Sequence, residues 1–161
     1  MEGAAFERAL RPLLRRSGAY AFSILRERKA AEDAVQQAAL HAWQRRGLFN
    51  ASCPFAGWWY AILRNHCLDT LRRTKRMPTS VRLDDAQLAA PADEGFLNRR
   101  ALERAMEQLS EAHRETLKLR YFGDLSYEDI AAVLEVPKGT VMSRLHLARK
   151  ALATLMQTEA Q

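Results

Sequence analysis

Apolar residues recur along most of this chain at the spacing of an α-helix, in steps of three and four residues. Residues 30–46 carry the clearest pattern, because their apolar positions form one continuous stripe: Ala31, Ala34, Val35, Ala38, Ala39, Ala42 and Trp43. Residues 54–73 predict a second helix, with Pro54 suited to its first turn. Residues 6–28 predict an earlier helix or helix pair, and Pro12 is placed to interrupt it. We therefore expect an all-α fold.

A second group of signals, nearer the C-terminus, predicts a helix-turn-helix. Ser110 can cap one helix. Ser126, followed three residues later by Asp129, resembles a capping box at the start of a short helix over residues 127–134. A tight turn at residues 135–137 then leads into another helix, whose buried positions are Val141, Leu145, Ala148 and Leu152. Two helices joined by so short a turn are typical of the helix-turn-helix motif.

The distribution of charge divides the chain into three parts. Residues 1–76 contain 14 basic and 6 acidic side chains, a net charge of +8. Residues 77–97 contain 1 basic and 4 acidic side chains, two prolines and no sustained helical period. Residues 98–161 have a net charge of +1. This pattern predicts two small helical domains, 1–76 and 98–161, joined by a flexible linker over 77–97.

The composition excludes several classes of protein. The chain has 161 residues, a net charge of +6 and two cysteines that form no CxxC pair. A disulfide-stapled secreted scaffold is therefore excluded, and a reducing compartment is the default. No apolar run reaches the ~18 residues of a membrane span, and the N-terminus lacks the separate apolar block of a signal peptide. We expect a cytoplasmic protein whose basic charge permits a polyanionic partner.

The first domain combines clustered arginines with aromatic residues, a combination that suits single-stranded nucleic acid. The alternative, which periodicity alone favours, is that Phe55, Trp58 and Trp59 are core residues and that the arginines form a solvated helix end. Trp58 and Trp59 are adjacent and point about 100° apart on a helix. They cannot both lie at the centre of one narrow apolar stripe, so both interpretations remain open.

The last helix suits a DNA-reading role, because residues 138–150 carry basic side chains and no acidic one. Thr140, Ser143 and Arg144 lie near its N-terminal end, which is the end that enters the major groove in this motif. Arginine pairs with guanine, and threonine and serine bind phosphates or base edges. The alternative is an ordinary helical hairpin with a basic outer face. Spacing, caps and charge together favour the DNA-reading helix.

Three segments together resemble the extracytoplasmic function (ECF) sigma factors, the smallest group of the bacterial sigma-70 superfamily: AEDAVQQAALHAW, PFAGWWYAILRNHCLDTLRR and LSEAHRETLKLRYFGDLSYEDIAAVLEVPKGTVMSRLHLARKAL. The match covers roughly residues 6–75 and 98–152. It is specific because two separate blocks occur in the right order across a linker of the right size. The resemblance implies a non-enzymatic factor that binds core RNA polymerase and directs promoter recognition and transcription initiation. It also implies an anti-sigma factor as a partner, no cofactor and no small-molecule substrate.

The resemblance further implies roles for individual residues. The first segment matches the helix that docks on the coiled coil of the largest polymerase subunit, at Asp33, Gln36, Gln37 and Trp43. Phe49 and Asn65 match positions that line a pocket for a flipped-out base of the melted −10 element. The basic residues that would follow the separating strands are Arg64, Arg72, Arg73, Lys75 and Arg76. The last helix matches the one that reads the −35 element as duplex, with candidate contacts Lys138, Thr140, Ser143, Arg144 and Arg149.

Three positions depart from the family pattern. Gln37 stands where the family usually has an acid, which is expected to alter the strength of the polymerase contact. Glu135 stands in the turn where the family usually has glycine, so either its backbone is strained or the turn differs. Met142 replaces a basic residue, so either one phosphate contact is missing or Met142 touches a thymine methyl group.

Two rival functions have weaker support. A response regulator with a LuxR-type helix-turn-helix, binding DNA as a dimer, would need a βα receiver domain in residues 1–76, where no β-branched strand runs occur. An enzyme would need a catalytic constellation, and the sequence shows neither a Gly-rich phosphate loop nor a nucleophile–base pair. A metal site could be imagined from His41, Cys53, His66 and Cys67. However, His66 and Cys67 point about 100° apart and Cys67 fits the buried stripe, so no metal is expected.

Overall fold

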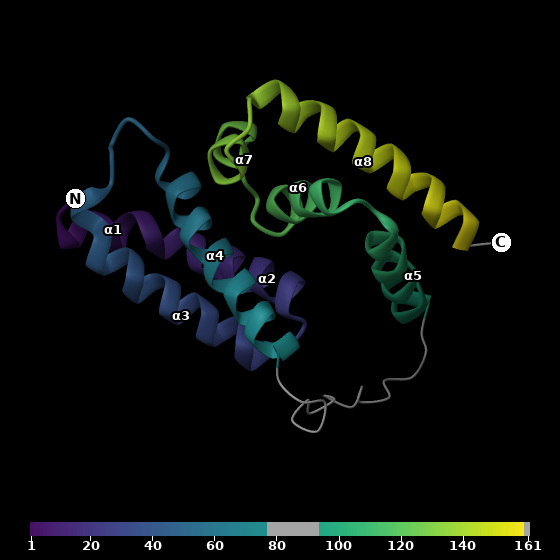
Figure 1. The fold of residues 1–161 in the computed structure, drawn as a ribbon, viewed down its shortest axis with the longest axis horizontal. Helices are drawn as coiled ribbons and strands as arrows, with labels where there is room; N and C mark the ends of the chain where they lie inside the picture. Colours follow the sequence, from purple (N-terminus) through teal and green to yellow (C-terminus); the bar gives the residue numbers. More distant parts are fainter. Residues whose placement is uncertain (77–93, 160–161) are drawn as a thin grey trace.

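The computed structural model of the chain describes residues 1–76 and 94–159, and within these two ranges it contains helices and no strand (Figure 1). The all-α prediction is confirmed. The receiver domain that a response regulator requires is absent from residues 1–76, which form helices only. No helix in the described ranges is both long enough and apolar enough to span a membrane.

The first domain consists of the predicted helices together with two short 3₁₀ turns. The elements are α1 (Gly3–Leu10), η1 (Arg11–Leu13), α2 (Leu14–Leu25), α3 (Arg28–Arg45), η2 (Arg46–Leu48) and α4 (Phe55–Arg76). Pro12 does interrupt the first helix, because it sits in the 3₁₀ turn η1. Helix α3 stops at Arg45 and continues as the 3₁₀ turn η2, which contains Gly47.

The second domain consists of α5 (Glu94–Gln108), α6 (Glu111–Tyr121), α7 (Tyr127–Leu134) and α8 (Lys138–Glu159). Helix α5 begins inside the range 77–97 that was predicted as linker, and residues 77–93 of that range lie outside the described residues. The helix-turn-helix is α7 and α8, and the predicted capping box between Ser126 and Asp129 is present. Glu135 ends α7 with φ 53°, so the turn is kept and a non-glycine residue adopts the left-handed conformation.

Alanines on α3 bring that helix close to α4 in the first domain. Ala31, Ala34, Ala38 and Ala42 are all buried, as the apolar stripe predicted. Trp59 of α4 is fully buried, and its indole N–H donates to the Ser17 hydroxyl of α2 at 2.8 Å. Ser17 is also buried and donates to the Leu13 carbonyl at 2.8 Å. Trp58 is only partly buried, so the two adjacent tryptophans do separate as their 100° spacing requires.

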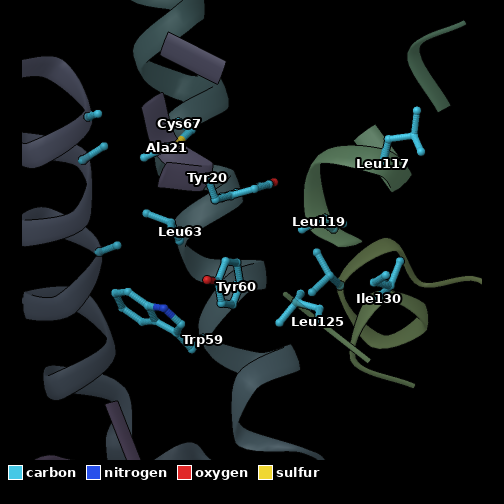
Figure 2. Packing of buried hydrophobic residues seen from close by; sticks show 14 of the residues in the cluster. Tyr20, Ala21, Trp59, Tyr60, Leu63, Cys67, Leu117, Leu119, Leu125 and Ile130 are labelled. Atoms are coloured by element: carbon cyan, nitrogen blue, oxygen red, sulfur yellow. The ribbon is translucent and has the colours of Figure 1, made fainter. Parts of the chain in front are cut away.

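The two domains pack against each other through α4, which contacts α7, and through α2, which contacts α6. The Tyr60 hydroxyl donates to the Gly123 carbonyl at 3.3 Å, and a Cβ placed on Gly57 would lie 3.1 Å from the Ala132 Cβ. Figure 2 shows the result, a hydrophobic cluster that runs from Leu63 and Tyr60 to Leu125 and Leu119 of the second domain. Helix α4 therefore belongs to the packing of both domains.

We expect Ser17→Ala to lower the free energy of unfolding by about 1–3 kcal/mol, because it leaves the buried Trp59 N–H without an acceptor. Ser23→Ala on the same helix is the matched control, since the Ser23 hydroxyl donates only to a local carbonyl, that of Tyr20, and lies at a less buried position. Urea unfolding followed by tryptophan fluorescence measures both variants. Equal losses in the two would contradict a structural role for the Ser17–Trp59 hydrogen bond.

Candidate nucleic-acid and polymerase interfaces

The polar face of α3 is accessible along its length. The predicted polymerase contacts Asp33, Gln36 and Gln37 are all exposed on the side opposite the alanine stripe. Trp43, counted in the buried stripe, is in fact 37% exposed, with the Arg46 guanidinium 4.0 Å from its ring centroid. Leu40 lies on the same helix and is 53% exposed. The exposure of Leu40 was not predicted, although its position off the apolar stripe could have indicated it.

The loop between η2 and α4 places an aromatic side chain over the first turn of α4. Phe49 is half-buried, with its ring centroid 5.2 Å from that of Trp58 and 5.6 Å from that of Phe55. Asn50 stabilises the loop, because its side-chain oxygen accepts hydrogen bonds from both the backbone N–H and the hydroxyl of Ser52. Asn65 is exposed two turns further along α4, about 10 Å beyond Trp58. Phe49 and Asn65 therefore do not lie side by side.

The basic residues of α4 fall into two groups. Arg72, Arg73, Lys75 and Arg76 are exposed at the C-terminal end of the helix, as predicted. Arg72 pairs with Asp69 at 2.8 Å. Arg64 is different, because it forms an ion pair and hydrogen bond with Glu115 of α6, and the two side chains are only 27% and 21% exposed. In this arrangement of the domains, Arg64 faces the second domain.

The residues that α8 exposes to solvent are not the ones predicted from its charge. Val141, Leu145 and Ala148 are buried, as predicted. The rest of the helix surface carries exposed side chains, two of them large and apolar: Met142 (52% exposed), which lies on the side of Tyr127 and Arg149, and then Ser143, His146, Leu147 (51% exposed) and Lys150. His146 and Leu147 were not predicted from charge, although a helical projection opposite the buried stripe would have found both.

The other predicted contacts of α8 lie on its flanks. Lys138 pairs with Glu128 of α7, and Arg149 donates to the Tyr127 hydroxyl at 3.4 Å. Both side chains are exposed, on the flank that faces α7. Thr140 and Arg144 are half-buried on the opposite flank. Ser143 is thus the one predicted contact that lies on the outward face.

An apolar groove separates the two domains on another side of the molecule. It is lined by residues of α2, α5, α6 and α8, with Phe22, Leu102, Tyr121 and Phe122 each at least 40% exposed. Lys118 also lines the groove, and burial, together with the charges of Arg114 and Arg26, lowers its pKa to about 8. A carboxylate brought into the groove would favour the charged form of Lys118.

The four side chains considered as metal ligands do not form one site. Cys53 is exposed in the loop before α4, whereas Cys67 is fully buried, and burial raises the pKa of its thiol to about 12. His41 and His66 do come together, with His41 Nδ1 3.1 Å from His66 Nε2. Within the part of the chain that the structure describes, no group of three or more His, Cys, Asp or Glu side chains is arranged to hold a metal ion.

Two regions of the chain match known protein families. Residues 8–77 match the family model for sigma-70 region 2, and residues 99–152 match that for sigma-70 region 4. RNA polymerase sigma-H factor of Pseudomonas aeruginosa is 36% identical over 142 residues, which cover 79% of this chain and 73% of that protein. ECF RNA polymerase sigma factor SigL of Mycobacterium tuberculosis is 34% identical over 145 residues, covering 86% and 81%.

A solved structure extends the agreement to the arrangement of the helices. The sigma factor RpoE, determined in complex with the anti-sigma factor NepR from Bartonella quintana, aligns with a TM-score of 0.70 at 30% identity and covers 95% of this chain and 97% of its own. The two matched regions, their order, and the relatives that span both lead to one conclusion: the chain belongs to the ECF sigma factors of the sigma-70 family and acts as an RNA polymerase sigma factor.

Proposed function

We propose that this sigma factor docks on core RNA polymerase through the exposed face of α3 and reads a promoter at two places. Helix α8 reads the −35 element as duplex, and the loop before α4 with the basic end of α4 holds the melted −10 strand. The observation that carries the proposal is that all three surfaces are accessible although none is needed for the hydrophobic core. Run-off transcription with core polymerase on a library of random promoters tests it directly, and absence of any directed start site would end it.

The outward face of α8 gives the −35 contact a mixed chemistry. Met142 and Leu147 are exposed apolar side chains, which suit the C5-methyl group of thymine. Ser143 and His146 lie between them and offer hydrogen-bonding groups for base edges. Lys138 and Arg149 on the flank that faces α7 then suit phosphates, whereas Arg144 on the other flank suits the edge of a guanine. The chemistry of Met142 favours the thymine-methyl alternative for this departure from the family pattern.

The two domains pack against each other in this structure, and we call this the closed arrangement. For this mechanism, the domains have to separate. Helix α4 and helix α8 both pack on α7, so at the usual 8–10 Å per helix contact their axes pass within about 20 Å of each other beside α7. Two promoter elements separated by two turns of duplex lie about 70 Å apart. One rigid closed body cannot reach both elements. Opening also releases Arg64 from Glu115, so Arg64 becomes available to the −10 strand only in the open state.

The proposal includes a protein that holds the factor inactive. RpoE of known structure, 30% identical to this chain, was determined with an anti-sigma factor bound. We propose that an anti-sigma partner likewise binds this chain in the cytoplasm, and that the factor itself has no catalytic activity. A purified anti-sigma partner is expected to inhibit run-off transcription increasingly as its concentration rises, until transcription is abolished.

The first prediction concerns the −35 contact. We expect Arg144→Ala and His146→Ala each to cost about 1–3 kcal/mol at one base pair of the −35 element and to leave the other positions unchanged. Lys150→Ala is the control, because an exposed lysine further along α8 is expected to weaken matched and mismatched sites equally. Binding of the isolated promoter duplex by the holoenzyme, with each position mutated in turn, gives the answer. Direct readout is wrong if the unsubstituted protein does not distinguish these duplexes.

The second prediction concerns the basic end of α4. We expect replacing Arg73, Lys75 and Arg76 by glutamine to flatten the dependence of log K on log salt by about 0.7 for each single-strand phosphate that these side chains no longer neutralise. Replacing Arg8, Arg11 and Arg15 removes the same charge from exposed positions near the start of the domain, and is expected to leave the slope nearly unchanged. Open-complex stability measured over a range of salt concentrations compares the two. Equal slopes would remove this end of α4 from the −10 contact.

The third prediction concerns opening. A disulfide between Gly57→Cys and Ala132→Cys, in a Cys53→Ser background, is expected to lock α4 to α7. A Cβ at Gly57 would lie 3.1 Å from that of Ala132, so the two helices need to move apart by only about 0.5 Å to reach the 3.5–4.5 Å that a disulfide requires. Promoter-directed transcription should be abolished in the oxidised protein and return on reduction. Each single cysteine variant under the same oxidising conditions is the control. Full activity of the cross-linked protein would show that the closed arrangement is already competent.

A further inference from the structure

Two histidines meet on the surface of the first domain, outside the core and outside the surfaces assigned above. His41 comes from α3 and His66 from α4, and both are partly exposed. Their ring centroids lie 5.3 Å apart with the planes at 80°, and His41 Nδ1 lies 3.1 Å from His66 Nε2. The pair is 25 residues apart in sequence, so the packing of α3 on α4 alone brings it together.

The separation of the two nitrogens fits two ligands of one metal ion. Imidazole nitrogens bind Zn²⁺ at 2.0–2.1 Å, which puts two of them about 3.3 Å apart at the tetrahedral angle and about 2.9 Å apart at a right angle. The observed 3.1 Å lies between these values.

The surroundings keep an imidazole lone pair available. Burial and the neighbouring His41 lower the pKa of His66, with Arg73 acting in the same direction and Asp69 opposing it. A lowered pKa disfavours the imidazolium form, and the neutral imidazole is the form that binds metals. Of these neighbours, Asp69 and Arg73 lie on α4 with His66 itself, and His41 is the group that faces it from α3.

We propose that His41 and His66 form a two-imidazole site for a divalent transition-metal cation of the Zn²⁺, Ni²⁺ or Cu²⁺ class, which ties α3 to α4. Since no third protein ligand gathers with them in the described ranges, the remaining positions on the metal are open to water or to a donor from a bound protein. Imidazole is the ligand type these three cations share.

The site lies close to the surface proposed to dock on the polymerase. His41 follows Gln37 by four residues on α3, so the two side chains are neighbours on one face of that helix. A cation bound there would add positive charge and an open coordination position beside Gln37. Metal occupancy is thereby coupled to docking as well as to the stability of the α3–α4 pair.

The test measures metal binding by the full chain, without polymerase or promoter, so that its outcome is independent of the proposed function. Zn²⁺ and Ni²⁺ are titrated calorimetrically into the protein, and Cu²⁺ binding is followed by electron paramagnetic resonance. We expect one ion per chain, nitrogen coupling from two imidazoles, and a rise in Tm of a few degrees at saturating metal. His41→Gln and His66→Gln should each weaken binding by at least about 10- to 100-fold.

Three further variants are the matched controls. His113→Gln and His146→Gln each remove a histidine elsewhere, and Cys53→Ser removes the exposed thiol; all three should bind metal like the unsubstituted chain. Circular dichroism of His41→Gln and His66→Gln establishes that both remain folded. Absence of stoichiometric binding, or binding that survives both substitutions, would overturn the proposal and leave the pair as an interhelical hydrogen bond only.

Discussion

Helix α4 is the element on which the rest of this structure depends, because it is buried on two sides at once. Adjacent residues of α4 bond to different domains: the Trp59 indole N–H donates to Ser17 of the first domain, and the Tyr60 hydroxyl donates to the Gly123 carbonyl of the second domain. Both side chains belong to the cluster of Figure 2. A helix separates neighbouring side chains by about 100°, so one continuous element can serve two cores. The same helix then carries the basic residues towards its C-terminal end.

The contacts between the domains suit an arrangement that opens. The ion pairs Arg26–Glu103 and Arg16–Asp124 are about half exposed, and such pairs contribute little, about 0–1 kcal/mol each. The Tyr20 hydroxyl is buried and finds no hydrogen-bond partner among the described residues, which costs about 1–3 kcal/mol. The attraction between the domains therefore rests on the apolar contacts of α4 with the second domain and on the less exposed ion pair between Arg64 and Glu115. Within the first domain, by contrast, α2, α3 and α4 share a fully buried core.

The proposed promoter contacts differ in kind as well as in place. The outward face of α8 is partly apolar, so its contribution is expected to depend on the identity of the base pairs more than on salt. The end of α4 is almost wholly basic, so its contribution is expected to depend on salt and little on sequence. Dividing recognition in this way lets one domain choose the site while the other follows the strand that opens. In the proposed mechanism, the two contacts act together once α4 and α7 have separated.

The sequence by itself determined the helices and their ends. Local spacing and capping are properties of short segments, so the alanine stripe of α3, the Pro12 interruption and the capping box at Ser126 could all be predicted, and so could the family. The tertiary structure decided what those helices face. Pairing of Arg64 with Glu115, the meeting of His41 and His66, and the exposure of Leu147 depend on residues far apart in the chain or on which side of a helix is covered. Charge alone does not reveal which face packing has left open.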